Sequence, residues 1–278
     1  MIKNQLKTVL FLGILTGLLL LVGSFFGKTG LTIAIIFVCL MNFVTYWFSD
    51  KIVLFMYGAK EIEKKGKIYE LVKEVAKDTG VPIPRIFMIN QQYANAFATG
   101  RDPKHASIAF TKGILDFLSD EELKGVIAHE MAHVKNRDIL ISTIAATIAG
   151  VISYAAMMAR YAAIFGMGGR DRDNNIMGMI IMAIVAPIIA MFIQLAISRS
   201  REYLADETGA RNIKNPKALA SALKKLTDAV EVHPIKNKNT ATAHMFIVNP
   251  FTAKGFFTLL STHPPLDERV KRLNEMKI

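Results

Sequence analysis

Residues 119–134 of the chain read SDEELKGVIAHEMAHV. Ser119, followed three residues later by Glu122, is a capping-box pattern, which predicts a helix that begins here and reaches at least Val134. On that helix His129 and His133 are four residues apart, so their imidazoles lie on one face, about 6 Å from each other. Two imidazoles at this spacing can bind one zinc ion, and the stretch therefore predicts a metal-binding helix.

Glu130 completes an H-E-x-x-H motif and is the candidate catalytic base. One residue along a helix turns the side chain by roughly 100° from His129, which keeps the carboxylate near a metal-bound water without making it a ligand. Zinc lowers the pKa of water towards about 7, and a carboxylate that takes the proton prepares the water to attack a peptide carbonyl. The alternative is a pair of ordinary helix histidines, with no third ligand elsewhere in the chain.

Two carboxylates in Glu202-Tyr203-Leu204-Ala205-Asp206 supply a candidate third ligand. Because they are four residues apart, Glu202 and Asp206 share one helix face. We expect Glu202 to complete a His₂Glu zinc site and Asp206 to orient one of the imidazoles. A solvated charged face is the alternative. The single cysteine, Cys39, lies in an apolar run, which excludes a thiolate cluster for the metal and an intrachain disulfide.

The composition indicates a membrane protein, since 52% of the 278 residues are hydrophobic. Several stretches without formal charge are long enough to cross, as helices, the roughly 30 Å hydrocarbon core of a bilayer. These stretches are Thr8–Gly27, Thr29–Ser49, Ile139–Ala159 and Asn174–Ser198. We therefore predict an α-helical integral membrane protein with four transmembrane helices, the first an uncleaved anchor and not a signal peptide.

The net charge of +11 follows the predicted spans. Basic residues gather before span one, after span two and after span four, and they include Lys3, Lys7, Lys51, Lys60, Lys64, Lys65, Lys67, Arg199 and Arg201. This pattern predicts that both termini are cytoplasmic. Topology and attraction to anionic lipid account for the charge, so we expect no nucleic-acid partner. A G-x-x-x-x-G-K-[ST] loop is absent from the sequence, and we expect no nucleotide.

The predicted spans divide the chain into four parts. Residues 1–50 form two transmembrane helices, 51–138 the first part of a catalytic domain, 139–198 a transmembrane hairpin and 199–278 the second part of that domain. Each polar part is too small to carry a core alone, so we expect them to fold together as one cytoplasmic, mostly helical α+β domain.

Local patterns predict the elements of this split domain. In the first part they predict a helix from about Glu61 to Thr79 that ends at Gly80, and a small sheet of Arg85–Ile89 and Ser107–Phe110. In the second part they predict a helix through 199–206, a helix at 217–230 with Pro216 in its first turn, and a final helix after Pro265.

Several separated motifs resemble those of the M48 membrane peptidases, and specifically the HtpX heat-shock protease group. They are His129-Glu130-Met131-Ala132-His133, Ser200-Arg201-Glu202-Tyr203-Leu204-Ala205-Asp206, His263-Pro264-Pro265-Leu266-Asp267-Glu268-Arg269 and Asn95-Ala96-Phe97-Ala98-Thr99-Gly100. With the paired N-terminal spans, the resemblance covers nearly the whole chain. It implies a zincin-like domain with one zinc ion held by His129, His133 and Glu202, and Glu130 as the base.

The resemblance also implies roles for residues outside the metal site. His263 and Arg269 would position substrate or stabilise the oxyanion, and Asn95, Ala96 and Phe97 would border the cleft. The residues alone leave alternatives, because His263 could cap the final helix and Arg269 could pair with surface groups near Glu268. We expect the substrate to bind as an added strand along the sheet edge between 95 and 110.

The function that the resemblance implies is ATP-independent cleavage of damaged or misassembled membrane proteins and unfolded polypeptides, on the cytoplasmic side of a bacterial or archaeal inner membrane, as a stress response. One alternative is a prenylated-protein (CAAX-type) peptidase of the same clan, although four spans are few for the membrane chamber of that family. Another is a non-catalytic zinc-binding scaffold. Glu130 argues against the scaffold, because a structural zinc site needs no general base.

Overall fold

The computed structural model describes residues 27–140, 199–232, 246–247 and 264–278, with isolated positions 13, 16, 17, 20, 24 and 144. The elements in chain order are α2 (Gly27–Met56), β1 (Lys60–Glu61), α3 (Lys67–Thr79), β2 (Arg85–Ile89), β3 (Ala96–Gly100), the 3₁₀ turn η1 (Pro103–His105), β4 (Ala106–Thr111), α4 (Lys112–Phe117), α5 (Asp120–Asn136), α8 (Arg199–Asn212), α9 (Pro216–Val232) and α10 (Leu266–Asn274).

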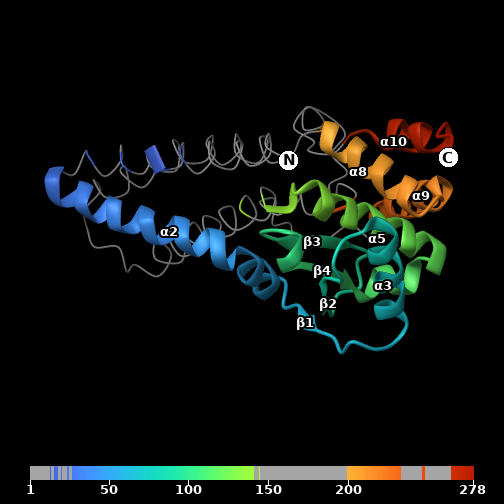
Figure 1. Ribbon diagram of the computed structural model, residues 1–278, viewed down its shortest axis with the longest axis horizontal. Helices are drawn as coiled ribbons and strands as arrows, with labels where there is room; N and C mark the ends of the chain where they lie inside the picture. Colours follow the sequence, from blue (N-terminus) through green and yellow to red (C-terminus); the bar gives the residue numbers. More distant parts are fainter. Residues whose placement is uncertain are drawn as a thin grey trace.

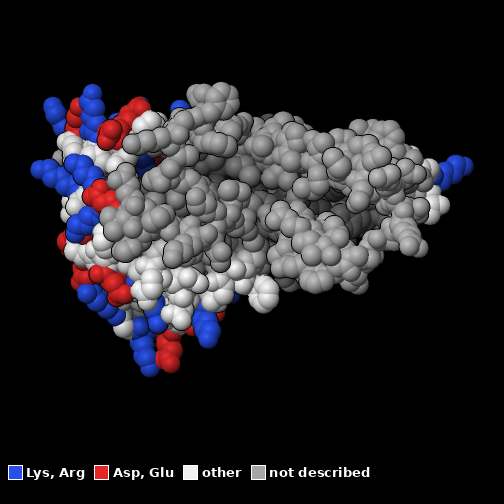
Figure 2. Space-filling view, turned by 180° about the vertical axis from the view of Figure 1, so that it is seen from behind, with Lys and Arg blue, Asp and Glu red and all other residues white. Residues whose placement is uncertain are grey.

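Helix α2 extends away from the sheet and the remaining helices (Figure 1). Within the described ranges it is the one helix whose length and composition suit a membrane crossing, with an apolar window at Gly27–Val44. This helix contains the predicted span Thr29–Ser49. The other three predicted spans lie almost wholly outside the described residues, so their number stays a prediction. Charged side chains of the described residues gather at the opposite end of the molecule (Figure 2).

The predicted sheet is confirmed and has two strands more than expected. β2 and β4 pair in parallel, β1 joins β2 and β3 joins β4, both antiparallel, in the order β1-β2-β4-β3. The sequence gives little sign of β3, because alanine and glycine are uncommon in strands. Since β4 lies between two strands, the expectation that substrate could add anywhere along 95–110 is wrong for β4. Within that region the edge strand is β3.

Helix α5 runs through the centre of the domain, with β3 and α3 on one side and α8 and α9 on the other (Figure 1). Its predicted start is confirmed, since the Ser119 N–H donates to Glu122 Oε2 at 2.9 Å and the Glu122 N–H donates to Ser119 Oγ at 3.4 Å. Val126, Ile127 and Met131 are fully buried in the main core. The capping box therefore begins a helix that contacts α3, β3, α8 and α9.

Helix α3 ends as predicted, at Gly80, whose left-handed φ of 69° suits a residue without a side chain. It begins later than predicted. Lys60 and Glu61 pair with β2 as strand β1, and Gly66, with a φ of 90°, precedes the first helical turn at Lys67. Strand pairing therefore takes the first residues of the charged pattern away from the helix.

Two glycines allow close helix crossings against α5. A Cβ on Gly209 of α8 would lie 2.8 Å from backbone atoms of Ala128, and a Cβ on Gly125 would lie 2.7 Å from the backbone nitrogen of Leu219 on α9. Any side chain at these positions would force the helices apart, because packed backbones cannot overlap. The Gly209 crossing brings the first turns of α8 over the H-E-x-x-H motif.

Candidate metal centre

The two histidines of α5 face each other and the carboxylate of Glu202 on α8. His129 Nε2 and His133 Nε2 are 3.1 Å apart, and they lie 3.7 and 3.5 Å from the Glu202 oxygens. The candidate ligand atoms of all three residues lie within 4.8 Å of one another. Two imidazole nitrogens and one carboxylate oxygen are a donor set that suits zinc and leaves a fourth position for water or substrate. The structure thus brings the three predicted ligands together.

A carboxylate backs each imidazole on the side away from this cluster. His129 Nδ1 lies 2.9 Å from Asp206 Oδ1, and His133 Nδ1 lies 3.0 Å from Asp138 Oδ2. A carboxylate partner fixes the proton on Nδ1 and leaves the Nε2 lone pair for a metal. Asp206 stands where the sequence predicted an orienting residue. Asp138 is a member of the site that the sequence reasoning missed.

Asp138 reaches His133 through a tight turn at the end of α5. Arg137 adopts a left-handed conformation with φ 58°, and the backbone N–H of Asp138 donates to the His133 carbonyl at 3.2 Å. Few residues other than glycine adopt this conformation, and such positions cluster at functional sites. The only signal in the sequence is an acidic residue just after the last turn of the motif helix.

The carboxylates around His133 favour positive charge at this site. Burial opposes the charged imidazolium, but Asp138, Glu202 and Glu130 outweigh it and raise the pKa of His133 to about 10. A divalent cation at Nε2 would replace that proton, so metal binding should release protons and weaken as the pH falls.

Arg269 of α10 holds the carboxylate that backs His129. Its Nε and Nη2 donate to the two oxygens of Asp206, each at 2.7 Å, and its Nη1 donates to the carbonyl of Ile247 at 3.1 Å. Burial alone would raise the pKa of Asp206, but Arg269 and His129 hold it well below its usual range. Only 2% of Arg269 is exposed, so the alternative of a surface ion pair near Glu268 is wrong.

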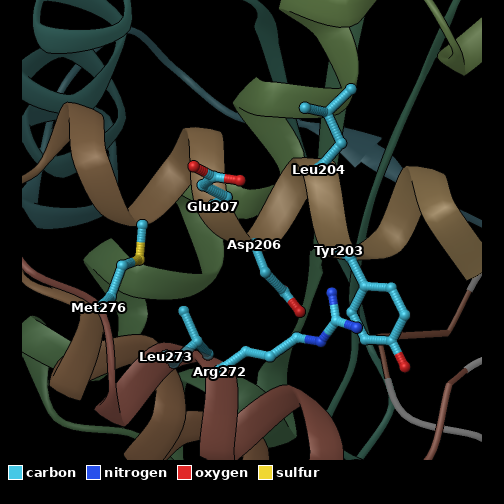
Figure 3. A pocket seen from close by; sticks show the side chains of 7 residues that line it. All are labelled: Tyr203, Leu204, Asp206, Glu207, Arg272, Leu273 and Met276. Atoms are coloured by element: carbon cyan, nitrogen blue, oxygen red, sulfur yellow. The ribbon is translucent and has the colours of Figure 1, made fainter.

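Helices α8 and α10 also meet outside this buried pair, around a groove of about 410 Å³. Figure 3 shows residues of α8 and α10 that line this groove, with the guanidinium of Arg272 on α10 over the ring of Tyr203 on α8. The guanidinium carbon lies 3.8 Å from the ring centroid, and Nη2 also donates to Glu268 at 2.9 Å. These contacts join α10 to α8 beside the site and help to keep Arg269 in place.

Glu130 lies between the histidines and the sheet. Its Oε2 accepts a hydrogen bond from the backbone N–H of Ala98 on β3 at 2.8 Å. Burial raises the pKa of the Glu130 carboxyl above its ordinary value, and the nearby His129 and His133 partly offset this rise. A raised pKa brings a carboxylate closer to the range in which it can exchange protons near neutral pH.

The three residues predicted to border the cleft have different surroundings. Asn95 is buried, and its Oδ1 accepts from the Ile247 N–H at 3.2 Å, while its Nδ2 has no hydrogen-bond partner among the described residues. Ala96 packs in the main core, whereas Phe97 faces α2, with its ring 5.0 Å from that of Tyr57. The predicted residue His263 lies outside the described residues.

Comparisons with known proteins place the chain in a family. The pattern of "Peptidase family M48" matches residues 63–277. A "Protease HtpX homolog" of Syntrophotalea carbinolica is 51% identical over 99% of both chains. Proteins with the same description from Persephonella marina and Thermococcus kodakarensis are 54% and 51% identical over 98% of this chain, and over 97% and 95% of their own lengths.

A solved structure has a similar fold. The crystal structure of S. mikatae Ste24p superposes with a TM-score of 0.54 at 18% sequence identity, over 98% of this chain and 66% of Ste24p. The chain thus spans about two thirds of the length of Ste24p, and the likeness concerns the fold alone. From the family match and the extent of identity, the chain belongs to peptidase family M48, as a membrane-bound zinc metalloprotease of the HtpX type.

Proposed function

We propose that the chain is an endopeptidase in which His129, His133 and Glu202 hold one zinc ion and Glu130 is the catalytic base. The observation that carries the proposal is the meeting of three donor groups within 4.8 Å, from helices far apart in the sequence. A His₂Glu set with an open fourth position is characteristic of catalytic zinc, whereas structural zinc usually has four protein ligands.

Each residue of the site has a separable task in peptide hydrolysis. When bound, zinc would polarise the peptide carbonyl and lower the pKa of water. Glu130 would accept a proton on its carboxylate and deliver it to the departing amide nitrogen, while the Ala98 N–H keeps that carboxylate oriented. Asp138 and Asp206 would hold the histidines, and Arg269 would hold Asp206.

The predicted direct role of Arg269 towards substrate rests on the family resemblance, whereas its role towards Asp206 rests on two hydrogen bonds. Its guanidinium already donates to Asp206 and to the carbonyl of Ile247, although Nη1 also lies 3.8 Å from Glu202. The role of His263 in positioning substrate or stabilising the oxyanion rests on the family resemblance.

We infer that substrate lies along β3. Its central residue Ala98 bonds to Glu130, so a peptide beside this strand would pass close to the base. Asn95, directly before β3, has a buried Nδ2 without a hydrogen-bond partner among the described residues, and this group could donate to a peptide carbonyl. Main-chain recognition of this kind implies little dependence on substrate sequence. Proline substitution at Ala96, whose N–H lies with that of Ala98 on the side of β3 away from β4, should slow cleavage, whereas proline at Thr99 or within β4 would disrupt the sheet itself.

We further propose that the protein acts in proteolytic quality control at the cytoplasmic face of a bacterial or archaeal inner membrane. One zinc ion shared by His133 and Glu202 requires both on one side, so the chain between them crosses the membrane an even number of times. A cysteine at Gly168, outside the described residues, should label from the extracytoplasmic side in a Cys39→Ser background. Labelling only from the cytoplasm would contradict the four-span topology and leave the zinc site intact.

The activity is tested by digestion of unfolded casein with the detergent-solubilised full chain, with and without a chelator. We expect cleavage that chelation abolishes and zinc restores. Glu130→Gln should lower turnover by about 10²–10⁴-fold with zinc still bound at one ion per chain. Turnover that survives in Glu130→Gln would remove Glu130 from its role. Zinc binding without any cleavage would favour the scaffold alternative, and cleavage of prenylated peptides alone would favour the CAAX-type alternative.

A further inference from the structure

A groove of about 510 Å³ lies where α2 meets the sheet and the loop between β3 and β4. This volume falls within the roughly 300–1,000 Å³ of ordinary ligand pockets. Aromatic side chains from α2 and basic side chains from both sides line it, among them Phe43, Trp47, Phe48, Lys51, Arg101 and Lys104. The groove lies apart from the zinc ligands, because no residue of α5 or α8 lines it.

The groove lies at the level where a membrane would meet water. The apolar window of α2 ends at Val44, and Trp47 follows about 5 Å further along the helix axis. Tyr46 and Trp47 are 39% and 45% exposed, respectively. Tryptophan and tyrosine are enriched at the boundary between the hydrocarbon core and the headgroups. The end of α2 therefore places the groove beside the headgroups of the leaflet that faces the catalytic domain.

The charges around the groove favour an anion. Arg85 is held by Asp50 at 2.9 Å and by Ser107 at 3.2 Å, so it joins α2 to the sheet. Asp102 accepts from the backbone N–H groups of Lys104 and His105, at 2.8 and 3.0 Å, and from the His105 ring. Asp50 and Asp102, the acidic groups that the described residues place beside the groove, are thus already bound within the protein.

Three further basic side chains line the groove and can contact a ligand there. Arg101 lies 3.7 Å from Asp102 and stacks over Trp47 at 4.7 Å, and Lys51 lies over the ring of Phe48 at 5.2 Å. Lys104 is exposed and forms no ion pair with the described residues. Cations over aromatic rings form a surface that accepts both a phosphate and the apolar start of an acyl chain.

We propose that this groove binds the phosphate headgroup of an anionic phospholipid from the bilayer that α2 crosses. Lys51, Arg101 and Lys104 contact the phosphate, and Trp47 and Phe48 contact the glycerol and the first acyl carbons. The argument rests on α2 as a membrane helix and is independent of the zinc chemistry.

The lipid site adjoins the strand that contacts the base. Arg101 directly follows Gly100, the last residue of β3, and Ala98 of that strand donates to Glu130. A bound headgroup therefore holds the β3–β4 loop against the membrane, and Arg101 of this loop is three residues from Ala98, which contacts Glu130. Occupancy of the groove fixes the position of β3 relative to the bilayer.

Intrinsic fluorescence tests the proposal directly, because Trp47 is the only tryptophan in the sequence. The full chain is reconstituted in phosphatidylcholine nanodiscs with increasing phosphatidylglycerol, and its emission is recorded. We expect a saturable change for the unmodified chain. In Lys51→Ala/Lys104→Ala the half-saturating phosphatidylglycerol fraction should rise about tenfold. The matched control is Lys64→Ala/Lys77→Ala, which removes the same charge from exposed positions outside the groove and should leave the half-saturation unchanged.

Three results would overturn the proposal. An equal change in the groove variant and the control would mean that only net surface charge matters. A flat response of the unmodified chain would mean that no headgroup binds beside Trp47. The same emission change on addition of inorganic phosphate to pure phosphatidylcholine nanodiscs would mean a site for free phosphate. Unchanged zinc content and unfolding midpoint in both double variants ensure that a lost response reports the groove and not misfolding.

Discussion

His129 and His133 present the same atom to the metal site, yet the carboxylates behind them come from different distances along the chain. His133 is held by Asp138, five residues further on, through the turn that ends α5. His129 is held by Asp206, which α8 brings back from a distant part of the sequence, and Arg269 of α10 holds Asp206 in turn. We refer to residues 129–138 as the local half of the site and to Glu202, Asp206 and Arg269 as the packed half.

The difference concerns what each half requires in order to exist. The local half depends on one helix and its terminal turn, so it forms whenever α5 forms. The packed half depends on α8 and α10 docking against α5, which includes the close crossing at Gly209. Damage to the local half should therefore act mainly on metal binding, while damage to the packed half should affect both the metal and the stability of the domain.

The largest effect is expected from Glu202→Ala, which removes the one packed residue that would touch the metal. Because two imidazoles alone hold zinc weakly, both the bound zinc and proteolysis should fall to background. Zinc analysis of the purified protein and casein digestion measure the two. Glu207→Ala is the matched control, since Glu207 is exposed on the same helix and pairs with Arg211. Normal zinc content in Glu202→Ala would move the third ligand elsewhere, with Asp206 the first candidate.

Arg269→Met tests whether the packed half supports the fold. This change leaves the buried Asp206 carboxylate without its bidentate partner, and breaking a buried ion pair in this way costs about 3–5 kcal/mol of unfolding free energy. Denaturant unfolding in detergent measures it. Lys271→Met, at an exposed ion pair with Glu275 beside the same helix, should cost less than about 1 kcal/mol. Equal losses in the two variants would contradict the distinction.

Asp138→Asn and Asp206→Asn compare the two halves directly. Each removes the anionic partner of one histidine and should weaken zinc binding by about 10–100-fold, measured by competition with a chelator. Asp206→Asn should also lower the unfolding midpoint more than Asp138→Asn does, because the buried Arg269 loses the carboxylate that accepts two of its hydrogen bonds. A similar loss of stability in Asp138→Asn would show that the local half also supports the fold.

The smallest expected effect concerns Glu122, which joins α5 to α9. Burial opposes its charge, but Lys225 at 2.9 Å, Ser221 at 2.7 Å and the Ser119 N–H lower the pKa of Glu122 from 4.5 to about 2. Because the folded pKa lies below the unfolded one, the stabilisation is complete above about pH 4.5 and is lost as the pH falls towards 2.

Glu122→Gln provides the measurement. Its unfolding free energy should lie below that of the unmodified chain by a constant amount above pH 5, and the gap should narrow on acidification. A gap that does not change with pH would mean that the charge of Glu122 does not contribute.

The contrast between the halves also explains what the sequence could predict. His129, Glu130 and His133 follow from helix periodicity, as does the shared face of Glu202 and Asp206. The proximity of the two helices does not follow from periodicity, and family resemblance supplied that link. Asp138 was missed because its position depends on a left-handed residue, Arg137, that no local pattern favours.

Other misses have the same origin in non-local packing. The partner of Arg269 lies 63 residues away, and burial of its guanidinium depends on how α10 docks. Strand β3 consists mainly of small residues and exists because β4 pairs with it in register from Ala96 to Gly100. Helix ends at Gly80 and Ser119, in contrast, were predicted correctly because the determining groups are neighbours in sequence.

The missing side chain at Gly209 has a consequence for how much the chain between α5 and α8 can vary in length. The α5–α8 distance is set where the two backbones touch, and not by the length of the chain that connects the two helices. Loop-closure entropy rises slowly, by about 0.6 kcal/mol per doubling of a flexible connection. Segments of very different size that keep an even number of membrane crossings can therefore be inserted between residues 138 and 198 without changing the catalytic geometry, whereas a single residue inserted between His129 and His133 would rotate one ligand away from the metal. Large insertions are therefore tolerated in the chain that connects the two halves, and even small ones are not tolerated within either half.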